Sequence, residues 1–133
     1  MFVDTCFCVD LMRETLRGES GPAIGKLRRL GGVRLQMPLF VLCELQAGAR
    51  MASNARRELR RVERFAEQFD LVCPDVTFAV GYGVNEASLR QAGHPIPTMD
   101  LLVGTLAQLY GMPLITRDSE HYRRLPGLVV ESY

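Results

Sequence analysis

The segment from Thr98 to Asp118 places two carboxylates at the ends of two otherwise apolar elements. Apolar residues recur at helical spacing after Thr98, a common N-cap residue, and Gly111 is a typical helix stop, so a helix is predicted here. The apolar run 113–116 then predicts a short buried strand, and Asp118 lies just past its carboxyl end. Open α/β sheets place their functional sites at such strand ends. Asp100 could still be a simple helix-terminal charge, and Asp118 an ordinary turn residue, so neither acid alone identifies a site.

The rest of the chain alternates predicted strands with predicted helices. Apolar or alternating runs predict strands at 1–3, 33–37, 71–73 and 128–130, in addition to 113–116. A first helix or helical turn is expected from Cys8 to Met12. Further helices are expected after a Ser20 cap, from Pro38, after an Asn54 cap and from Pro74, with a short helical turn at 120–122. This order predicts a three-layer α/β fold in which a mostly parallel central sheet is flanked by helices, in a single domain spanning residues 1–133.

Two of these helices carry specific expectations. The helix from Pro74 is expected to bury a stripe made of Val76, Ala79, Val80, Val84 and Ala87. The helix after Asn54 has an apolar face, and arginines crowd its other side. That charged side is interpreted as a solvated face, with an RNA or partner surface as the alternative.

Composition excludes several classes of protein. No apolar run approaches the roughly 20 residues that span a bilayer, and Asp4 and Asp10 interrupt the amino-terminal segment where a signal peptide would be apolar. We therefore expect no membrane association and a cytoplasmic location. The four cysteines form no C-x-x-C pair and lie in apolar segments, which predicts small buried residues rather than a disulfide framework or a zinc site. Of the 16 basic residues only Lys26 is lysine. Arginine suits phosphate contacts, although an arginine-biased genome explains the excess equally well.

Two further acids lie at the end of one predicted apolar element and within another. Asp4 ends the first predicted strand, and Glu44 interrupts the apolar helix from Pro38. Burying an unpaired carboxylate costs on the order of several kcal/mol, so Glu44 must face solvent, a partner or a metal. If Asp4, Glu44, Asp100 and Asp118 converge on one cleft, divalent cations would relieve their repulsion. All-oxygen ligands favour magnesium or manganese over zinc, and hydrolysis of a phosphodiester by metal-activated water is the natural chemistry.

The sequence resembles the PIN-domain family, in particular VapC-type toxins from bacterial or archaeal toxin–antitoxin pairs. The resemblance spans nearly the whole chain and rests on Phe2–Thr5, Cys43–Leu45 with Gly48, Asp100–Gly104, Leu114–Asp118 and Leu125–Leu128.

This resemblance implies an endoribonuclease that depends on Mg²⁺ or Mn²⁺. By resemblance, Asp4, Glu44 and Asp100 are the three metal-binding acids, Asp118 is the fourth, and Thr116 orients a carboxylate or a water. The family also implies a homodimer, an RNA substrate and inhibition by a small VapB-type antitoxin.

Three residues near these acids carry weaker expectations. Thr5 and Arg117 are candidate substrate contacts, although Arg117 could simply pair with Asp118. Cys6 departs from the Asn or Ser common at its position, and a thiol is a poorer hydrogen-bond donor to a carboxylate.

The same residues also allow different functions. A catalytically weak or inactive PIN-like module that binds RNA or protein is the main alternative. A haloacid-dehalogenase-type phosphatase would need an acid where Cys6 stands, and a receiver domain would need a late lysine. His121 is expected to pack or cap locally rather than to act in catalysis, and His94 to be structural or exposed.

Overall fold

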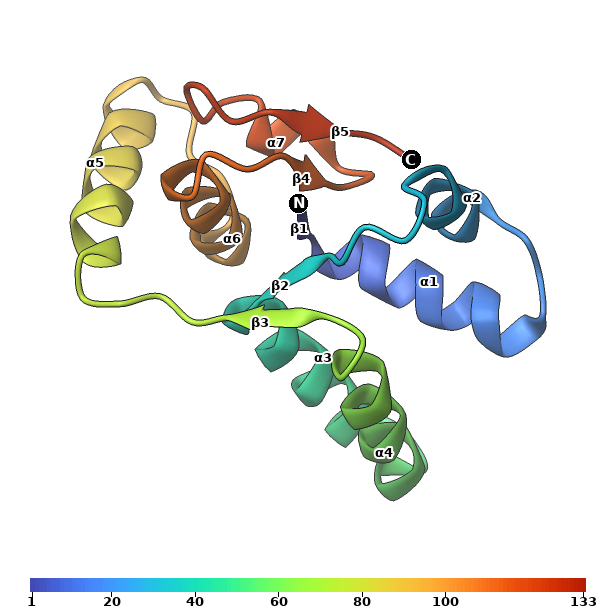
Figure 1. The fold of residues 1–133 in the computed structure, drawn as a ribbon. Helices are drawn as coiled ribbons and strands as arrows, with labels where there is room; N and C mark the ends of the chain where they lie inside the picture. The colour runs from blue at the N-terminus through green and yellow to red at the C-terminus, as the bar shows by residue number, and fades with distance from the viewer.

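A computed structural model describes residues 1–133 and contains a five-stranded parallel sheet of order β3-β2-β1-β4-β5. The strands are β1 (Phe2–Val3), β2 (Gln36–Pro38), β3 (Asp70–Val72), β4 (Leu114–Ile115) and β5 (Val130–Glu131). The helices are α1 (Thr5–Arg17), α2 (Pro22–Arg29), α3 (Leu39–Met51), α4 (Ala55–Ala66), α5 (Phe78–Gln91), α6 (Thr98–Leu109) and α7 (Ser119–Tyr122). Helices flank the sheet on both sides, with α5 and α6 on the left and α1 and α2 on the right in Figure 1. The predicted α/β fold with a parallel central sheet is confirmed.

The centre of the sheet is completely buried. Phe2 and Val3 of β1 and Leu114 and Ile115 of β4 have no exposed surface. Strands covered by helices on both faces read as continuous apolar runs rather than alternating ones, which is why these strands are visible in the sequence. The register pairs Phe2 with Leu114 and Val3 with Ile115, so the residues after the two strands emerge side by side.

Gly104 allows α7 to lie close against α6. A Cβ at this position would collide with the side chain of Leu125 and come within 3.0 Å of the Tyr122 ring. Tyr122 and Leu125 are themselves buried, so neither can move out into solvent. The segment after β4 is thereby held against the first half of α6, the helix that carries Asp100.

Helix starts agree only partly with the predicted caps. Asn54 caps α4 as predicted, because its side chain accepts a hydrogen bond from the backbone N–H of Arg57. The Ser20 cap is wrong: Gly21 occupies that position, and the Glu14 carboxylate accepts from the first backbone N–H groups of α2 instead. The Thr98 cap is also wrong, because Pro97 occupies the N-cap position and Thr98 is the first helical residue. A long-range carboxylate can replace a local cap, and local sequence does not reveal it.

The predicted core stripe of α5 is wrong, because all five of its residues are exposed. The exposed fraction reaches 87% at Val76 and 72% at Val80. The buried positions of α5 are Asn85 and Leu89, and the Asn85 amide donates to the Thr105 hydroxyl at 2.9 Å and to the Gln108 side chain at 2.7 Å. A hydrophobic pattern cannot identify a packed face that is organised around a polar residue.

The cysteines also differ from the prediction in part. Cys8 is buried, and burial raises the pKa of its thiol. Cys43 and Cys73, predicted to be buried, are exposed. Cys43 lies in α3 between the buried Val41 and Leu45, and Cys73 follows the edge strand β3, so an apolar neighbourhood in the sequence does not by itself bury a side chain. No helix is both long enough and apolar enough to cross a membrane.

Candidate active site

The ends of β1 and β4 bring Asp4 and Thr116 together. The backbone N–H of Asp4 donates to the carbonyl of Ile115, which continues the pairing of the two strands by one residue. Thr116 is fully buried, and its hydroxyl donates to Asp4 Oδ2 at 2.7 Å. The other carboxylate oxygen of Asp4 accepts from the N–H of Thr5 and so caps α1. A buried carboxylate with both oxygens hydrogen-bonded is held in one orientation.

Cys6 adds a third contact to this carboxylate. Its thiol donates to Asp4 Oδ2 at 3.2 Å and lies 3.3 Å from the Thr116 hydroxyl. The same sulfur accepts from the backbone N–H of Arg117 at 3.3 Å. Cys6 therefore occupies the place of a polar neighbour to Asp4, as a weaker donor than an amide.

Glu44 reaches the same region from α3. Its Oε2 accepts a hydrogen bond from the Thr5 hydroxyl at 2.5 Å, which joins the first turn of α1 to the middle of α3. The carboxylate faces the site rather than the apolar core, so the free-energy cost of burying an unpaired charge does not arise.

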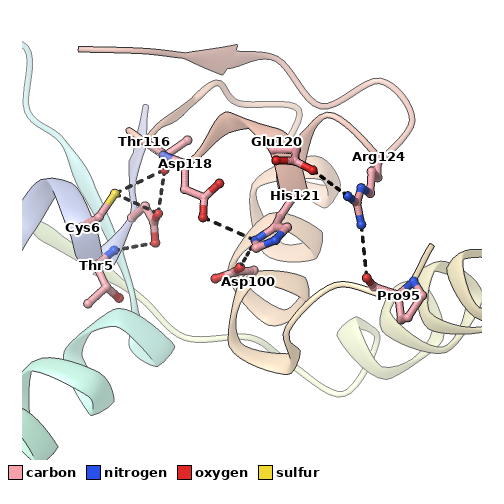
Figure 2. Close-up of polar contacts among 10 residues, drawn as sticks. Thr5, Cys6, Pro95, Asp100, Thr116, Asp118, Glu120, His121 and Arg124 are labelled. Atoms are coloured by element: carbon pink, nitrogen blue, oxygen red, sulfur yellow. Dashed lines mark hydrogen bonds and ion pairs between the residues drawn. The ribbon is translucent and has the colours of Figure 1, made fainter.

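Asp100 lies in the first turn of α6, where it contacts the segment after β4. Figure 2 shows the His121 ring between Asp100 and Asp118. Its Nδ1 atom lies 2.7 Å from Asp100 Oδ2 and 3.5 Å from Asp118 Oδ2. Burial raises the pKa of Asp100, the hydrogen bond to His121 partly offsets this, and the negative charge of Asp4 raises the pKa further. Asp118 is positioned through its own backbone, because its N–H donates to the Thr116 hydroxyl at 3.0 Å.

All four predicted acids line one cavity of about 300 Å³. Thr5, Cys6, Asp10 and Arg117 also line it. Two of the acids, Asp100 and Asp118, form with His121 the one group of three whose possible ligand atoms all lie within 4.8 Å of one another. Asp4 and Glu44 line the same cavity but do not belong to that group. The cavity thus gathers negative charge that only the Arg117 and Arg13 side chains at its lining offset.

Arg117 pairs with a different acid from the one expected. Its guanidinium lies 2.7 Å from Asp10 Oδ2, and its side chain remains 64% exposed. Asp10 also accepts from the Tyr133 hydroxyl at 2.8 Å, so this carboxylate anchors two side chains. The suggested pairing of Arg117 with Asp118 is therefore wrong.

His121 is the residue that sequence reasoning missed at this site. The sequence predicts local packing or capping for it, yet it bridges Asp100 and Asp118. Its position three residues after Asp118 on a predicted helical turn was the available signal, since residues three apart share a face. His94 is exposed, within the range expected for it.

Tyr122 lies behind the acids. Its side chain is fully buried and its hydroxyl has no hydrogen-bond partner. Burial raises the pKa of this phenol, and the negative charges of Asp4 and Asp100 raise it further. The phenol therefore stays neutral beside the carboxylates.

An apolar groove adjoins the acids. One part, about 370 Å³, lies between α1, α3 and α4 and includes Thr5 and Glu44 at its lining. A second part, about 260 Å³, lies between α1, α2 and α4, and the two parts share Met12, Leu16 and Arg61. The groove therefore runs along α1 and reaches the acidic cavity.

Comparison with known proteins gives a consistent result. The model of the PIN domain family matches residues 1–127. The tRNA(fMet)-specific endonuclease VapC of Salmonella typhimurium is 26% identical over 100 residues, which cover 75% of this chain and 76% of the relative. Ribonuclease VapC2 of Rickettsia felis is 25% identical over 94 residues, covering 71% and 70%. The crystal structure of VapBC2 from Rickettsia felis, bound to a DNA fragment from its promoter, superposes with a TM-score of 0.88. That match has 21% identity and covers 99% of this chain and 97% of the other.

Proposed function

The chain belongs to the PIN domain family, and from this premise we propose that it is a metal-dependent endoribonuclease, the toxin of a VapBC-type toxin–antitoxin pair. The observation that carries the proposal is the cavity lined by Asp4, Glu44, Asp100 and Asp118 at the ends of β1 and β4. Two relatives named as an RNA endonuclease and a ribonuclease support the same activity. Such an enzyme meets its RNA in the cytoplasm, where we place it.

The donor atoms of the cavity fit a divalent cation. Four carboxylates face one small space, and the pKa of Asp100 is raised by burial and by its acidic neighbours, which is the electrostatic situation that a cation relieves. We assign Asp4, Glu44, Asp100 and Asp118 to hold Mg²⁺ or Mn²⁺. Such an ion, when bound, supplies a water of lowered pKa and neutralises charge that develops on the phosphate.

The remaining residues position these acids and the substrate. The Thr116 hydroxyl fixes both the Asp4 carboxylate and the Asp118 backbone, and Thr5 fixes Glu44. We assign Arg117 to the RNA phosphate, because its guanidinium stands at the cavity lining with most of its surface exposed. Its ion pair with Asp10 orients the side chain, and the guanidinium N–H groups outside this pair can donate to a phosphate oxygen.

Cleavage of total cellular RNA by the purified protein tests the proposal. With Mg²⁺ or Mn²⁺ we expect discrete fragments. EDTA is expected to abolish them, and excess metal to restore them, because the acids alone supply no counter-charge for the phosphate. Cleavage that persists in EDTA would contradict the metal assignment. An intact, metal-binding protein that leaves RNA uncut would favour a PIN-like binding module instead.

A VapB-type antitoxin is the proposed partner, and the apolar groove along α1 is its proposed binding site. Several solved structures similar to this chain are VapBC complexes. The groove is largely apolar and reaches Thr5 and Glu44, so an amphipathic segment bound there would also block the cavity.

Replacing Leu16 with glutamate is expected to weaken capture of the antitoxin by about thirtyfold or more, the effect of losing one apolar anchor. Leu16 lines both parts of the groove and is 63% exposed, so the fold tolerates the change. Isothermal titration with a purified VapB-type antitoxin measures the loss. Val33→Glu, at an exposed site outside the groove, is the matched control. Equal affinity of the Leu16 variant and the control would place the antitoxin elsewhere.

We also propose that the chain forms a homodimer through the exposed apolar side of α5 and the end of α6. Five apolar side chains there have exposed fractions between 49% and 87%: Val76, Val80, Val84, Leu109 and Tyr110. Helix α5 lies at the outer edge of the fold beside α6 (Figure 1). Light scattering that gives the monomer mass of 14.9 kDa at all concentrations would contradict this assignment.

A further inference from the structure

His121 contacts two of the four acids, Asp100 and Asp118, at one side of the acidic cavity. Its Nδ1 atom lies 2.7 Å from Asp100 Oδ2 and 3.5 Å from Asp118 Oδ2 (Figure 2). The three side chains come from two elements, α6 and the segment that follows β4, and they are the tightest group of possible metal ligands in the molecule. One of its three donors is nitrogen.

The fold holds this imidazole in place. Asp118 precedes α7 and His121 lies three residues later, so both side chains leave the same side of one helical turn. Gly104 lets that turn approach α6, and the next residue, Tyr122, is fully buried. His121 itself is partly exposed, with 28% of its side-chain surface accessible. The ring is therefore anchored by its neighbours and open to a ligand.

The spacing of the donor atoms suits one shared ion. Two ligands that each lie about 2.0–2.2 Å from an ion are about 3 Å apart when they occupy neighbouring positions around it. The two distances from His121 Nδ1 bracket that value. One possible ligand atom of each residue lies within 4.8 Å of the other two, so Asp100, Asp118 and His121 could contact the same cation.

We propose that His121 supplies a nitrogen ligand to the divalent metal of this site, and that the site therefore selects Mn²⁺ over Mg²⁺. This inference rests on the proposed function, which identifies the site, and it extends that function by naming the ion. Mg²⁺ takes oxygen ligands almost exclusively and dehydrates reluctantly, whereas a first-row transition ion also accepts imidazole. An all-carboxylate cavity would leave the choice between the two ions open.

The competing role for His121 is that of a positioning residue, which would donate a hydrogen bond to Asp100 without touching the ion. The two roles differ in a spectroscopic property. A nitrogen bonded directly to Mn²⁺ modulates the electron spin echo of the bound ion, and a hydrogen-bonding imidazole outside the coordination sphere does not give this strong coupling.

The experiment uses the full chain with Mn²⁺ alone and Mg²⁺ alone as probes. Affinities are measured by isothermal titration, and the spin echo is recorded on the Mn²⁺ complex, for the wild type, His121→Ala and His121→Asp. For the wild type we expect Mn²⁺ to bind about tenfold or more tightly than Mg²⁺ and to show nitrogen modulation. His121→Ala is expected to weaken Mn²⁺ about tenfold or more, to change Mg²⁺ little and to remove the modulation. His121→Asp is expected to bind both ions with a ratio close to one. His94→Ala, at the other histidine, is the matched control and should behave as the wild type.

Two results would overturn the assignment. The first is a wild-type Mn²⁺ complex without nitrogen modulation, and the second is a His121→Ala variant with unchanged Mn²⁺ affinity. Because binding is measured without RNA, the outcome is independent of the nuclease assay. Selective Mn²⁺ binding with uncut RNA would leave this inference standing and reject the proposed function. Cleavage supported equally by both ions, without nitrogen modulation, would reject this inference alone.

Discussion

Replacing Asp100 with asparagine is expected to reduce RNA cleavage by roughly a thousandfold or more, about 4 kcal/mol of transition-state stabilisation. Asparagine keeps the size of the side chain and an acceptor for the hydrogen bond to His121, but it removes the charge that faces Asp4 and Asp118 in the proposed metal site. The measurement is kcat/KM on a fluorescent RNA substrate at saturating metal.

The fold of this variant should be retained, because the removed charge was itself costly. Burial and nearby acids disfavour the ionised form of Asp100, so its neutral replacement relieves repulsion. Urea unfolding of the variant should show no loss of stability. Asp70→Asn, which removes an exposed carboxylate paired with Arg34 at the edge of the sheet, is the matched control and should cleave as the wild type does. A fully active Asp100→Asn enzyme would exclude this carboxylate from the chemistry.

Replacing Phe2 with alanine is expected to lower the free energy of unfolding by about 3–5 kcal/mol, a large share of the 5–15 kcal/mol typical of such proteins. Phe2 has no exposed surface, lies on the central strand, and packs edge-on against Tyr110 with ring centroids 5.5 Å apart. The buried sheet cannot collapse into the space that the ring leaves, because strands on both sides are hydrogen-bonded to β1.

Urea denaturation measures this loss as a lower midpoint at an unchanged slope. Val129→Ala is the control, since Val129 is 57% exposed and its truncation should change stability by less than about 0.5 kcal/mol. A loss below about 1 kcal/mol for Phe2→Ala would mean that the centre of the sheet is less tightly packed than described.

The sequence allowed the sheet to be predicted well because its strands are buried on both faces. Uninterrupted apolar runs such as 1–3 and 113–116, each followed closely by an acid, are typical of buried parallel strands in a chain of this size. The faces of the helices were harder to predict. The valines of α5 follow helical spacing, yet the helix packs through Asn85, whose amide finds partners on α6 at least twenty residues away. Periodicity records how apolar a face is and carries no information on which polar groups pair across elements.

The same limit applies to the candidate site. The four acids were recognisable because each ends or interrupts an apolar element, and parallel strand ends must lie together. His121 and the pairing of Arg117 with Asp10 were not recognisable in this way. Asp10 and Arg117 are 107 positions apart, and nothing local to either residue indicates the other.

The pairing of β1 with β4 also sets the order in which the candidate site forms during synthesis. Asp4 precedes its hydroxyl partner Thr116 by 112 positions in the chain. A nascent chain therefore exposes Asp4 and Glu44 long before Asp118 and His121 exist. The four acids come together only after Asp118 has been translated and these distant contacts have formed, the slowest kind of folding step. The candidate site therefore cannot assemble on a chain from which β4 and the segment after it are still missing.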